Sequence, residues 1–229
     1  MSLLLEAWAW LTDPAQWSGP GAIGGRIGEH VLVTAAVVAA AAVVALPAGV
    51  LVGHTGRGRT AVVGIAGAAR AVPTLGLLTL LGLWLGIGVQ APILALVVLA
   101  VPSLLAGAYS GVQAVDPNVT GAARAVGMSE WQIVTRVELP LAAPVIIGGL
   151  RAAVLQVIAT ATLAAYLADV GLGRYLFSGL KSRDYAEMLA GALLVAALAL
   201  LAEVLLAQLQ RRARRAARLQ TTTNRKAHA

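Results

Sequence analysis

The 229-residue sequence has no cysteine, a single phenylalanine and only 12% charged residues. Without cysteine it can form neither disulfides nor thiolate-ligated metal sites. Its three histidines, His30, His54 and His228, are dispersed and give no pair at ligand spacing. The sequence therefore predicts no metal site.

Two short motifs are also missing. The first thirty residues lack a basic start, an apolar core and a small-residue cleavage site in succession, so we expect no cleaved signal peptide. No Gly-x-x-x-x-Gly-Lys-Ser/Thr phosphate loop occurs, so we expect ATP to be bound by other subunits. Segment 1–30 instead carries Trp8, Trp10 and Trp17, which is typical of an interfacial segment at headgroup level.

Long apolar runs dominate the remainder of the chain. Hydrophobic residues make up 59% of the sequence, and the runs approach the length of about 20 residues that crosses the hydrocarbon core. They predict an all-α integral membrane protein with about five transmembrane helices within residues 31–209. The expected spans are 31–53, 61–83, 91–112, 144–168 and 186–209. Pro47, Pro73 and Pro102 interrupt the first three, which indicates either a solute passage or kinks that set helix packing.

The distribution of Lys and Arg predicts the orientation. Eleven of them fall on one side of the predicted spans: Arg57, Arg59, Arg124, Arg136 and seven residues of the basic tail 210–229. Four fall on the other side: Arg26, Arg174, Lys181 and Arg183. We therefore expect an external N-terminus and a cytoplasmic C-terminus. The tail fits contact with an anionic membrane leaflet better than nucleic acid, so no nucleic-acid partner is expected.

A polar insert, 116–140, separates two of the apolar runs. Asp116-Pro117-Asn118 is a helix-start signal, and Val119, Ala122, Ala123 and Val126 recur at the spacing of one helix face. Gly127 is expected to end this helix in the left-handed conformation. Ser129 to Gln132 reads as a capping box that opens a second helix, predicted to stop near Leu139 because Pro140 follows. The pattern favours a docking corner over an ordinary amphipathic surface loop.

This insert resembles the cytoplasmic signature of the permease subunits of binding-protein-dependent ABC importers. The family signature is Glu-Ala-Ala, three residues, Gly, nine residues, Ile-x-Leu-Pro. Val137 stands here for its Ile and Gly121 for its Glu. The resemblance implies a type I ABC importer permease with a cytoplasmic coupling-helix loop. It further implies an ATPase-coupling set formed by Gly121, Ala122, Ala123, Gly127, Trp131, Leu139 and Pro140.

Three further segments resemble the osmoprotectant branch of this family. They begin at Arg70-Ala71-Val72-Pro73-Thr74, at Val101-Pro102-Ser103 and at Gly171-Leu172-Gly173. The resemblance implies import of glycine betaine, choline, carnitine or proline, with amino-acid or methionine import as the alternative. It implies a bacterial cytoplasmic membrane location and these partners: ATPase subunits that bind ATP and Mg, a second permease subunit, an external solute-binding protein and the lipid bilayer. No cofactor is expected in this chain.

Several residues are candidates for the solute pathway or gate. The full set is Arg70, Pro73, Thr74, Tyr109, Tyr175 and Phe177. Arg70 and Arg151 lie within apolar stretches, where a charge costs about 2.5–3.5 kcal/mol on insertion scales and faces a cavity or a partner. Glu203 is expected to form a structural ion pair. The external segment 171–180 is either a flap over the outer mouth or an interfacial turn.

Two rival functions would each need particular residues. An intramembrane serine protease would use Ser110 with His54 as its base. An ion-coupled secondary transporter would need carboxylates within the membrane and commonly an internal repeat, whereas the expected spans hold only Glu203 and, at the start of the last span, Glu187, and no repeat is evident. The sequence therefore predicts a permease subunit and not an enzyme.

Overall fold

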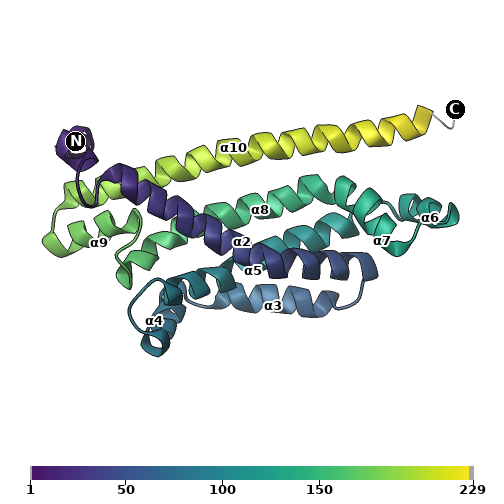
Figure 1. Ribbon diagram of the computed structural model, residues 1–229, viewed down its shortest axis with the longest axis horizontal. Helices are drawn as coiled ribbons and strands as arrows, with labels where there is room; N and C mark the ends of the chain where they lie inside the picture. The colour runs from purple at the N-terminus through teal and green to yellow at the C-terminus, as the bar shows by residue number, and fades with distance from the viewer. Residues whose placement is uncertain (1, 227–229) are drawn as a thin grey trace. The chain divides into compact units, whose positions relative to one another are not determined.

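The computed structural model describes residues 2–226, with the side chains of all of them except Arg70 and residues 218–226. Every element in this range is a helix. The α-helices are α1 (Ser2–Thr12), α2 (Ile23–Thr55), α3 (Arg59–Ala71), α4 (Thr74–Leu85), α5 (Gln90–Gln113), α6 (Pro117–Ala125), α7 (Glu130–Ile133), α8 (Leu139–Ala161), α9 (Gly173–Ser182) and α10 (Tyr185–Lys226) (Figure 1). Short tighter or wider turns occupy Pro14–Trp17, Val134–Glu138 and Thr162–Tyr166.

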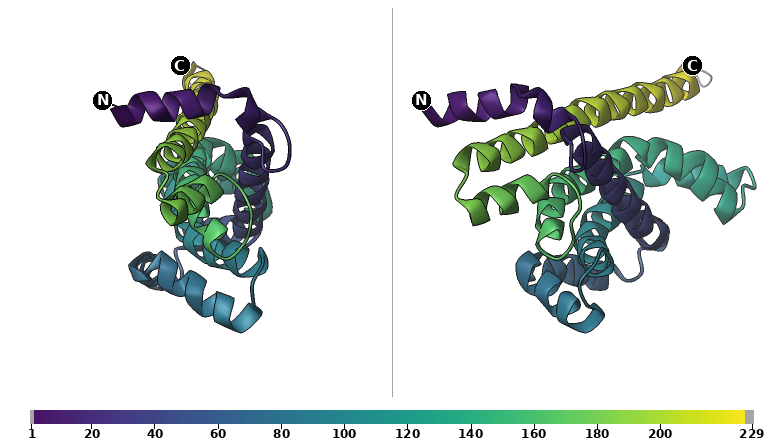
Figure 2. Two further views of the ribbon diagram at one scale, coloured as in Figure 1. Left: turned by 90° about the vertical axis from the view of Figure 1, so that its left-hand side faces the viewer. Right: turned by 60° about the vertical axis from the view of Figure 1, so that its left-hand side comes forward.

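The membrane-spanning helices follow the predicted order. Four described helices are long and apolar enough to cross a membrane, and a fifth span results if α3 and α4 count as one. The all-α prediction is thus confirmed, but the expected span 61–83 is broken into two helices. Segment 1–30 contains α1, which is joined to α2 through the turn Pro14–Trp17 (Figure 2).

The prolines act differently from one another. Pro47 and Pro102 lie inside the continuous helices α2 and α5, so neither ends its span. Pro73 separates α3 from α4 and caps the latter in an extended conformation. A proline removes one backbone donor and crowds the preceding turn, a defect that packed membrane helices can absorb through their neighbours. Of the three prolines, only Pro73 therefore interrupts a helix.

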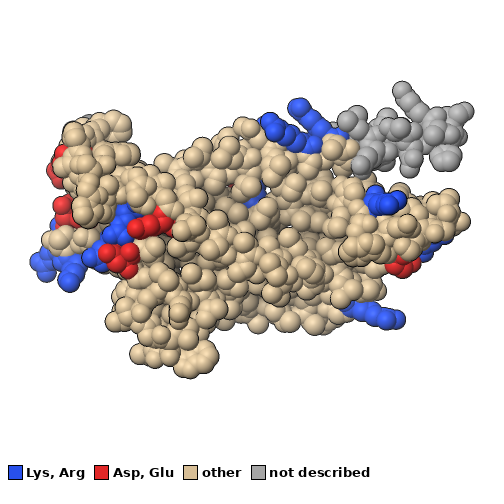
Figure 3. Space-filling view, in the orientation of Figure 1, with Lys and Arg blue, Asp and Glu red and all other residues tan. Residues whose placement is uncertain are grey.

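The chain divides into two compact units. Unit 1 comprises residues 1–40, 71–100 and 154–202, and unit 2 comprises 41–70, 101–153 and 203–229. Each of the four long helices contributes one part to each unit. Figure 3 shows the charged side chains of unit 1 gathered around α9 and the start of α2, while the middle of the long helices is almost uncharged. This distribution fits apolar spans with polar ends.

Unit 1 has a core built around α9. Ile23, Leu172 and Tyr175 are buried together. Trp10 packs edge-on against the Tyr175 ring with 5.1 Å between ring centroids. This core joins the N-terminal segment to segment 171–180.

In unit 2, α2 packs closely against α5. A Cβ added at Gly49 would lie 2.7 Å from the Leu105 carbonyl oxygen, and one added at Gly53 would lie 2.9 Å from that of Tyr109. Small residues spaced four apart let membrane helices approach in this way. Larger residues at either position would push the two helices apart.

Candidate functional site

The predicted corner in segment 116–140 is present. Asp116 caps α6 by accepting a hydrogen bond from the Asn118 amide, at 2.8 Å. Gly127 has φ +84°, the left-handed conformation expected of it. Ser129 and Gln132 form a capping box at the start of α7. The sequence signals for helix, corner and helix are therefore confirmed locally.

The prediction that the second helix stops near Leu139 is wrong. After α7 the backbone forms a π-helical turn, Val134–Glu138, and runs on through Pro140 into α8. Leu139 is itself helical, with φ −59° and ψ −46°, and its N–H bonds the carbonyl five residues back. The π turn widens the helix just before the proline, an adjustment by which membrane helices tolerate proline.

The small-residue face also differs from the predicted one. Ala123 is buried together with Thr120, against the remainder of unit 2, whereas Gly121, Ala122 and Val126 are exposed. α6 therefore turns Ala123 inward and offers its other small residues outward. Of the coupling set, Ala123 supports the segment from inside and is not free to meet a partner.

Trp131 is the main apolar side chain that the corner presents. It is 75% exposed, while Ile133 two residues later is fully buried. Trp131 and Leu139 border an apolar groove of about 620 Å³ whose other walls include Leu51 of α2 and Ile146 of α8. An exposed tryptophan beside small exposed residues is a surface suited to another protein.

A cluster of charged side chains links the two helices of the corner. The sequence analysis did not predict it. Arg124 of α6 donates two hydrogen bonds to the Glu130 carboxylate at 2.8 and 2.9 Å. The bond to Glu130 raises the pKa of Arg124. Glu130 also lies 3.2 Å from Nε2 of His54, whose Nδ1 is 2.8 Å from Glu138. His54 and Glu138 are 84 residues apart, so no local spacing could have indicated this contact.

The candidate gate residues are distributed over both units. Tyr109 and the backbone of Arg70 belong to unit 2, and the other four belong to unit 1. The side chain of Arg70 lies outside the described part of the chain. Pro73 is exposed and Thr74 half-buried at the start of α4. Tyr109 is buried, and its hydroxyl has no hydrogen-bond partner among the described residues.

Tyr175 is a core residue of unit 1. Its hydroxyl donates to the Gly21 carbonyl at 2.7 Å, and burial raises its pKa. Phe177 is half-buried with its ring 5.8 Å from that of Tyr166. Apolar side chains of segment 171–180 are thus buried against other residues of the same chain. The sequence alone does not reveal these contacts.

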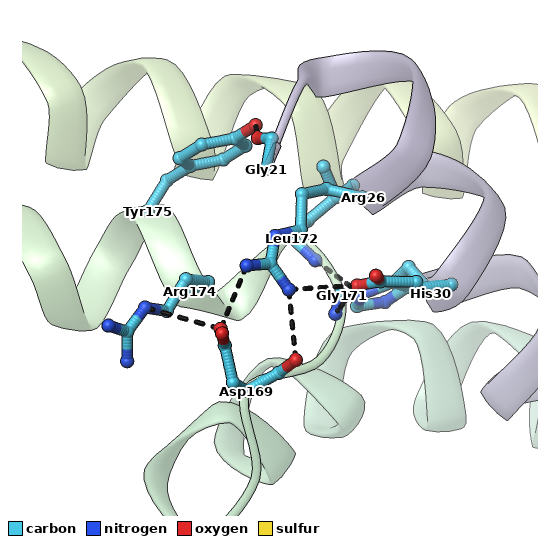
Figure 4. Close-up of polar contacts among 9 residues, drawn as sticks. Gly21, Arg26, His30, Asp169, Gly171, Leu172, Arg174 and Tyr175 are labelled. Atoms are coloured by element: carbon cyan, nitrogen blue, oxygen red, sulfur yellow. Dashed lines mark hydrogen bonds and ion pairs between the residues drawn. The ribbon is translucent and has the colours of Figure 1, made fainter. Parts of the chain in front are cut away.

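The loop before α9 is held to α2 by several polar contacts (Figure 4). Arg26 donates to the backbone and side chain of Asp169 at 2.9 and 2.8 Å. The Leu172 amide lies 3.3 Å from Nδ1 of buried His30, whose Nε2 lies 3.0 Å from the Ile158 carbonyl. One acceptor nitrogen and one donor nitrogen fit the neutral ring. Segment 171–180 is therefore anchored at its start.

Arg151 and Glu203 form an ion pair inside unit 2. The Arg151 guanidinium binds both carboxylate oxygens of Glu203 and also donates to the Gln210 side chain at 3.1 Å. The structure thus gives Arg151 a partner instead of a place in a solute path. It also confirms the structural role expected of Glu203.

The serine-protease arrangement is not formed. The Ser110 hydroxyl donates to the Ala106 carbonyl at 2.6 Å. Both ring nitrogens of His54 face carboxylates. A nucleophile requires a base within hydrogen-bond reach, and here each group is engaged elsewhere.

Apolar spanning helices with an exposed helix, corner and helix between two of them define a membrane permease subunit. The chain belongs to the family described as the binding-protein-dependent transport system inner membrane component. The match covers residues 45–215. This assignment confirms the predicted family. It also decides against the ion-coupled secondary transporter.

Individual relatives agree with this family. The chain is 34% identical over 184 residues to the carnitine transport permease protein OpuCB of Listeria monocytogenes, covering 80% of this chain and 84% of that protein. It is 32% identical over 187 residues to the glycine betaine/carnitine/choline transport system permease protein OpuCB of Bacillus subtilis, covering 82% and 86%. A solved chain of the inward-facing MetNI methionine ABC transporter has TM-score 0.74 and 21% identity, over 88% of this chain and 99% of that one. At that identity the structural likeness shows the fold alone.

Proposed function

We propose that the chain is the permease subunit of an ATP-driven importer for osmoprotectants with a quaternary or related amine, such as glycine betaine, choline, carnitine or proline. The observation that carries the proposal is the likeness to relatives named for carnitine, choline and glycine betaine transport over about four fifths of the chain. Methionine import rests only on a fold likeness at 21% identity, so it is the second candidate.

Coupling to separate ATPase subunits is assigned to segment 116–140. The support is its geometry: exposed Gly121, Ala122 and Trp131 flank a corner set by Gly127. Small residues let a partner backbone approach closely, and tryptophan supplies apolar area. A second permease subunit and an external solute-binding protein complete the proposed importer, as the family implies.

The substrate class is tested by uptake competition. In a strain that lacks its own osmoprotectant importers and expresses the complete transporter, labelled glycine betaine should accumulate in an ATP-dependent manner. Excess unlabelled betaine, choline or carnitine should reduce that uptake, and methionine should not. Methionine uptake without competition from quaternary amines would transfer the chain to the second candidate.

The proposed orientation places the N-terminus outside and the C-terminus in the cytoplasm. It is supported by the sorting of charges: Arg26, Arg174, Lys181 and Arg183 belong to unit 1, and the described Lys and Arg residues predicted on the cytoplasmic side belong to unit 2. Because the chain has no cysteine, single cysteines at Ser18 and Thr222 would be the sole targets of a thiol reagent. An impermeant maleimide should label Ser18→Cys in intact spheroplasts and Thr222→Cys only after lysis. Labelling of both in intact spheroplasts would contradict the five-span topology.

A further inference from the structure

The last turn of α2 carries a histidine held between two carboxylates. Nδ1 of His54 lies 2.8 Å from Oε2 of Glu138, and Nε2 lies 3.2 Å from Oε2 of Glu130. The contact of Nδ1 with Glu138 is a hydrogen bond, and the contact of Nε2 with Glu130 is at ion-pair distance. The His54 side chain is 13% exposed and that of Glu138 only 6%. One side chain of a spanning helix is thus fastened to two points of segment 116–140.

The π turn aims Glu138 at this histidine. Residues Val134–Glu138 form the widened turn, and α8 follows at once. An extra residue in a helix rotates everything after it by about 100°, because an α-helix has 3.6 residues per turn, and such turns recur at functional sites. A buried carboxylate requires a partner, and the partner described for Glu138 is His54. The irregular turn therefore makes a specific contact, between Glu138 at its end and His54 of α2.

The second carboxylate ties both arms of the corner together. Glu130 begins α7 on one side of Gly127, and Arg124 near the end of α6 binds it from the other side at 2.8 and 2.9 Å. His54 contacts the same carboxylate. A displacement of either helix of the corner therefore changes the contacts of His54.

α2 is in turn fixed against its neighbour. Gly53 directly precedes His54 and Gly49 lies five residues before it, and both bring the α2 backbone against α5, where a Cβ would collide with the Leu105 or Tyr109 carbonyl. Close-packed helices move as units and do not deform continuously. A displacement of His54 therefore moves α2 and α5 together.

We propose that His54 is a positioning residue that transmits movement of the ATPase-docking corner to α2, through its contacts with Glu138 and Glu130. This inference rests on the proposed docking role of segment 116–140. It assigns His54 no contact with the ATPase or with the solute. The role is transmission between a docking surface and a spanning helix, so its signature is loss of coupling without loss of docking.

The test compares purified complete transporters in proteoliposomes. Two quantities are measured: the amount of ATPase subunit retained, and the number of solute molecules imported per ATP hydrolysed. His54→Ala should retain the ATPase as the wild type does, while the solute-to-ATP ratio falls about fivefold or more, the lower end of measured couplings between sites. The double variant His54→Gln with Glu138→Gln replaces the pair by two amides that can bond each other, and should recover most of the ratio. Arg57→Gln, which removes an exposed charge three residues from His54, is the matched control and should equal the wild type.

Three outcomes would overturn the proposal. The first is a wild-type ratio in His54→Ala. The second is loss of ATPase retention in parallel with the ratio, because His54 would then only shape the docking surface. The third is an amide pair as defective as His54→Ala. If the alanine variant does not assemble, His54→Leu, whose side chain cannot form a hydrogen bond, is measured in its place and the same criteria apply.

Failure of the proposed function gives a different result. The ratio is measured with whichever solute the wild type imports, so a wrong substrate class leaves the test of His54 intact. A wild-type complex that retains no ATPase subunit would refute the proposed function itself, before any variant is compared. The two proposals are therefore distinguishable in one series of preparations.

Discussion

Gly127→Val is expected to abolish retention of the ATPase subunit and, with it, ATP-driven uptake. Gly127 has φ +84°, a conformation that costs L-residues about 1–2 kcal/mol and is least accessible to β-branched side chains. Valine must either accept that cost or straighten the turn between α6 and α7. Straightening would displace Trp131 from Ala122, and a loss of about 1.4 kcal/mol in docking already lowers affinity tenfold. We expect at least that reduction in co-purified ATPase.

The structure shows by which cause Gly127→Val would act, and this determines the control variant. A Cβ at Gly127 would meet no atom within 4 Å, so steric collision is excluded and only the backbone conformation is at stake. Gly127→Asn should therefore retain the ATPase, because asparagine enters the left-handed region more readily than other residues. Ala122→Glu, at an exposed position, should block docking with the corner intact. Full ATPase retention in both Gly127→Val and Ala122→Glu would show that the segment is a surface loop.

The same burial pattern changes how Ala123 is interpreted. Sequence periodicity places Ala122 and Ala123 on one helix face. Ala123 is 8% exposed, however, and packs within unit 2. A charge there would disturb the fold of the unit instead of testing the partner surface. Periodicity indicates which residues share a face, but not whether its partner is the same chain or another one.

Local signals were the ones that sequence reasoning interpreted correctly. The Asp116 cap, the left-handed Gly127 and the Ser129 capping box each depend on residues within a few positions of one another. The apolar runs predicted the long helices for the same reason, since burial in lipid is decided by composition over about 20 residues. Such features need no knowledge of distant parts of the chain.

The errors arose where a distant contact or a continuous helix overrode a local preference. The extended conformation expected before Pro140 gave way to a π turn that continues into α8. Two further contacts have no local signal in the sequence. Tyr175 donates a hydrogen bond to the Gly21 carbonyl, 154 residues away. His54 contacts Glu130 and Glu138. A protein with few charges can still place them in specific pairs across its helices.

The pair Arg151–Glu203 permits a prediction about stability, because its two partners are not equivalent once separated. Their side chains are about one-third exposed, at 34% and 30%, and both lie in helices that cross the membrane. Arginine cannot be deprotonated in proteins, whereas a carboxyl group can take up a proton and become neutral. Glu203→Gln therefore leaves a permanent charge in an apolar stretch, while Arg151→Gln leaves a group that can lose its charge.

We expect Glu203→Gln to destabilise the protein more than Arg151→Gln does. An arginine near the helix centre costs about 2.5–3.5 kcal/mol on insertion scales, and this sets the upper bound for Glu203→Gln, since Arg151 keeps its bond to Gln210 and can extend towards the interface. The double variant Arg151→Gln with Glu203→Gln should recover most of the loss, because no unpaired charge remains. Thermal unfolding in detergent, followed by the fluorescence of the five tryptophans, gives the order of the three variants. Equal loss in both single variants, or a double variant with the summed loss, would mean that the residues act independently and that the ion pair contributes nothing to the fold.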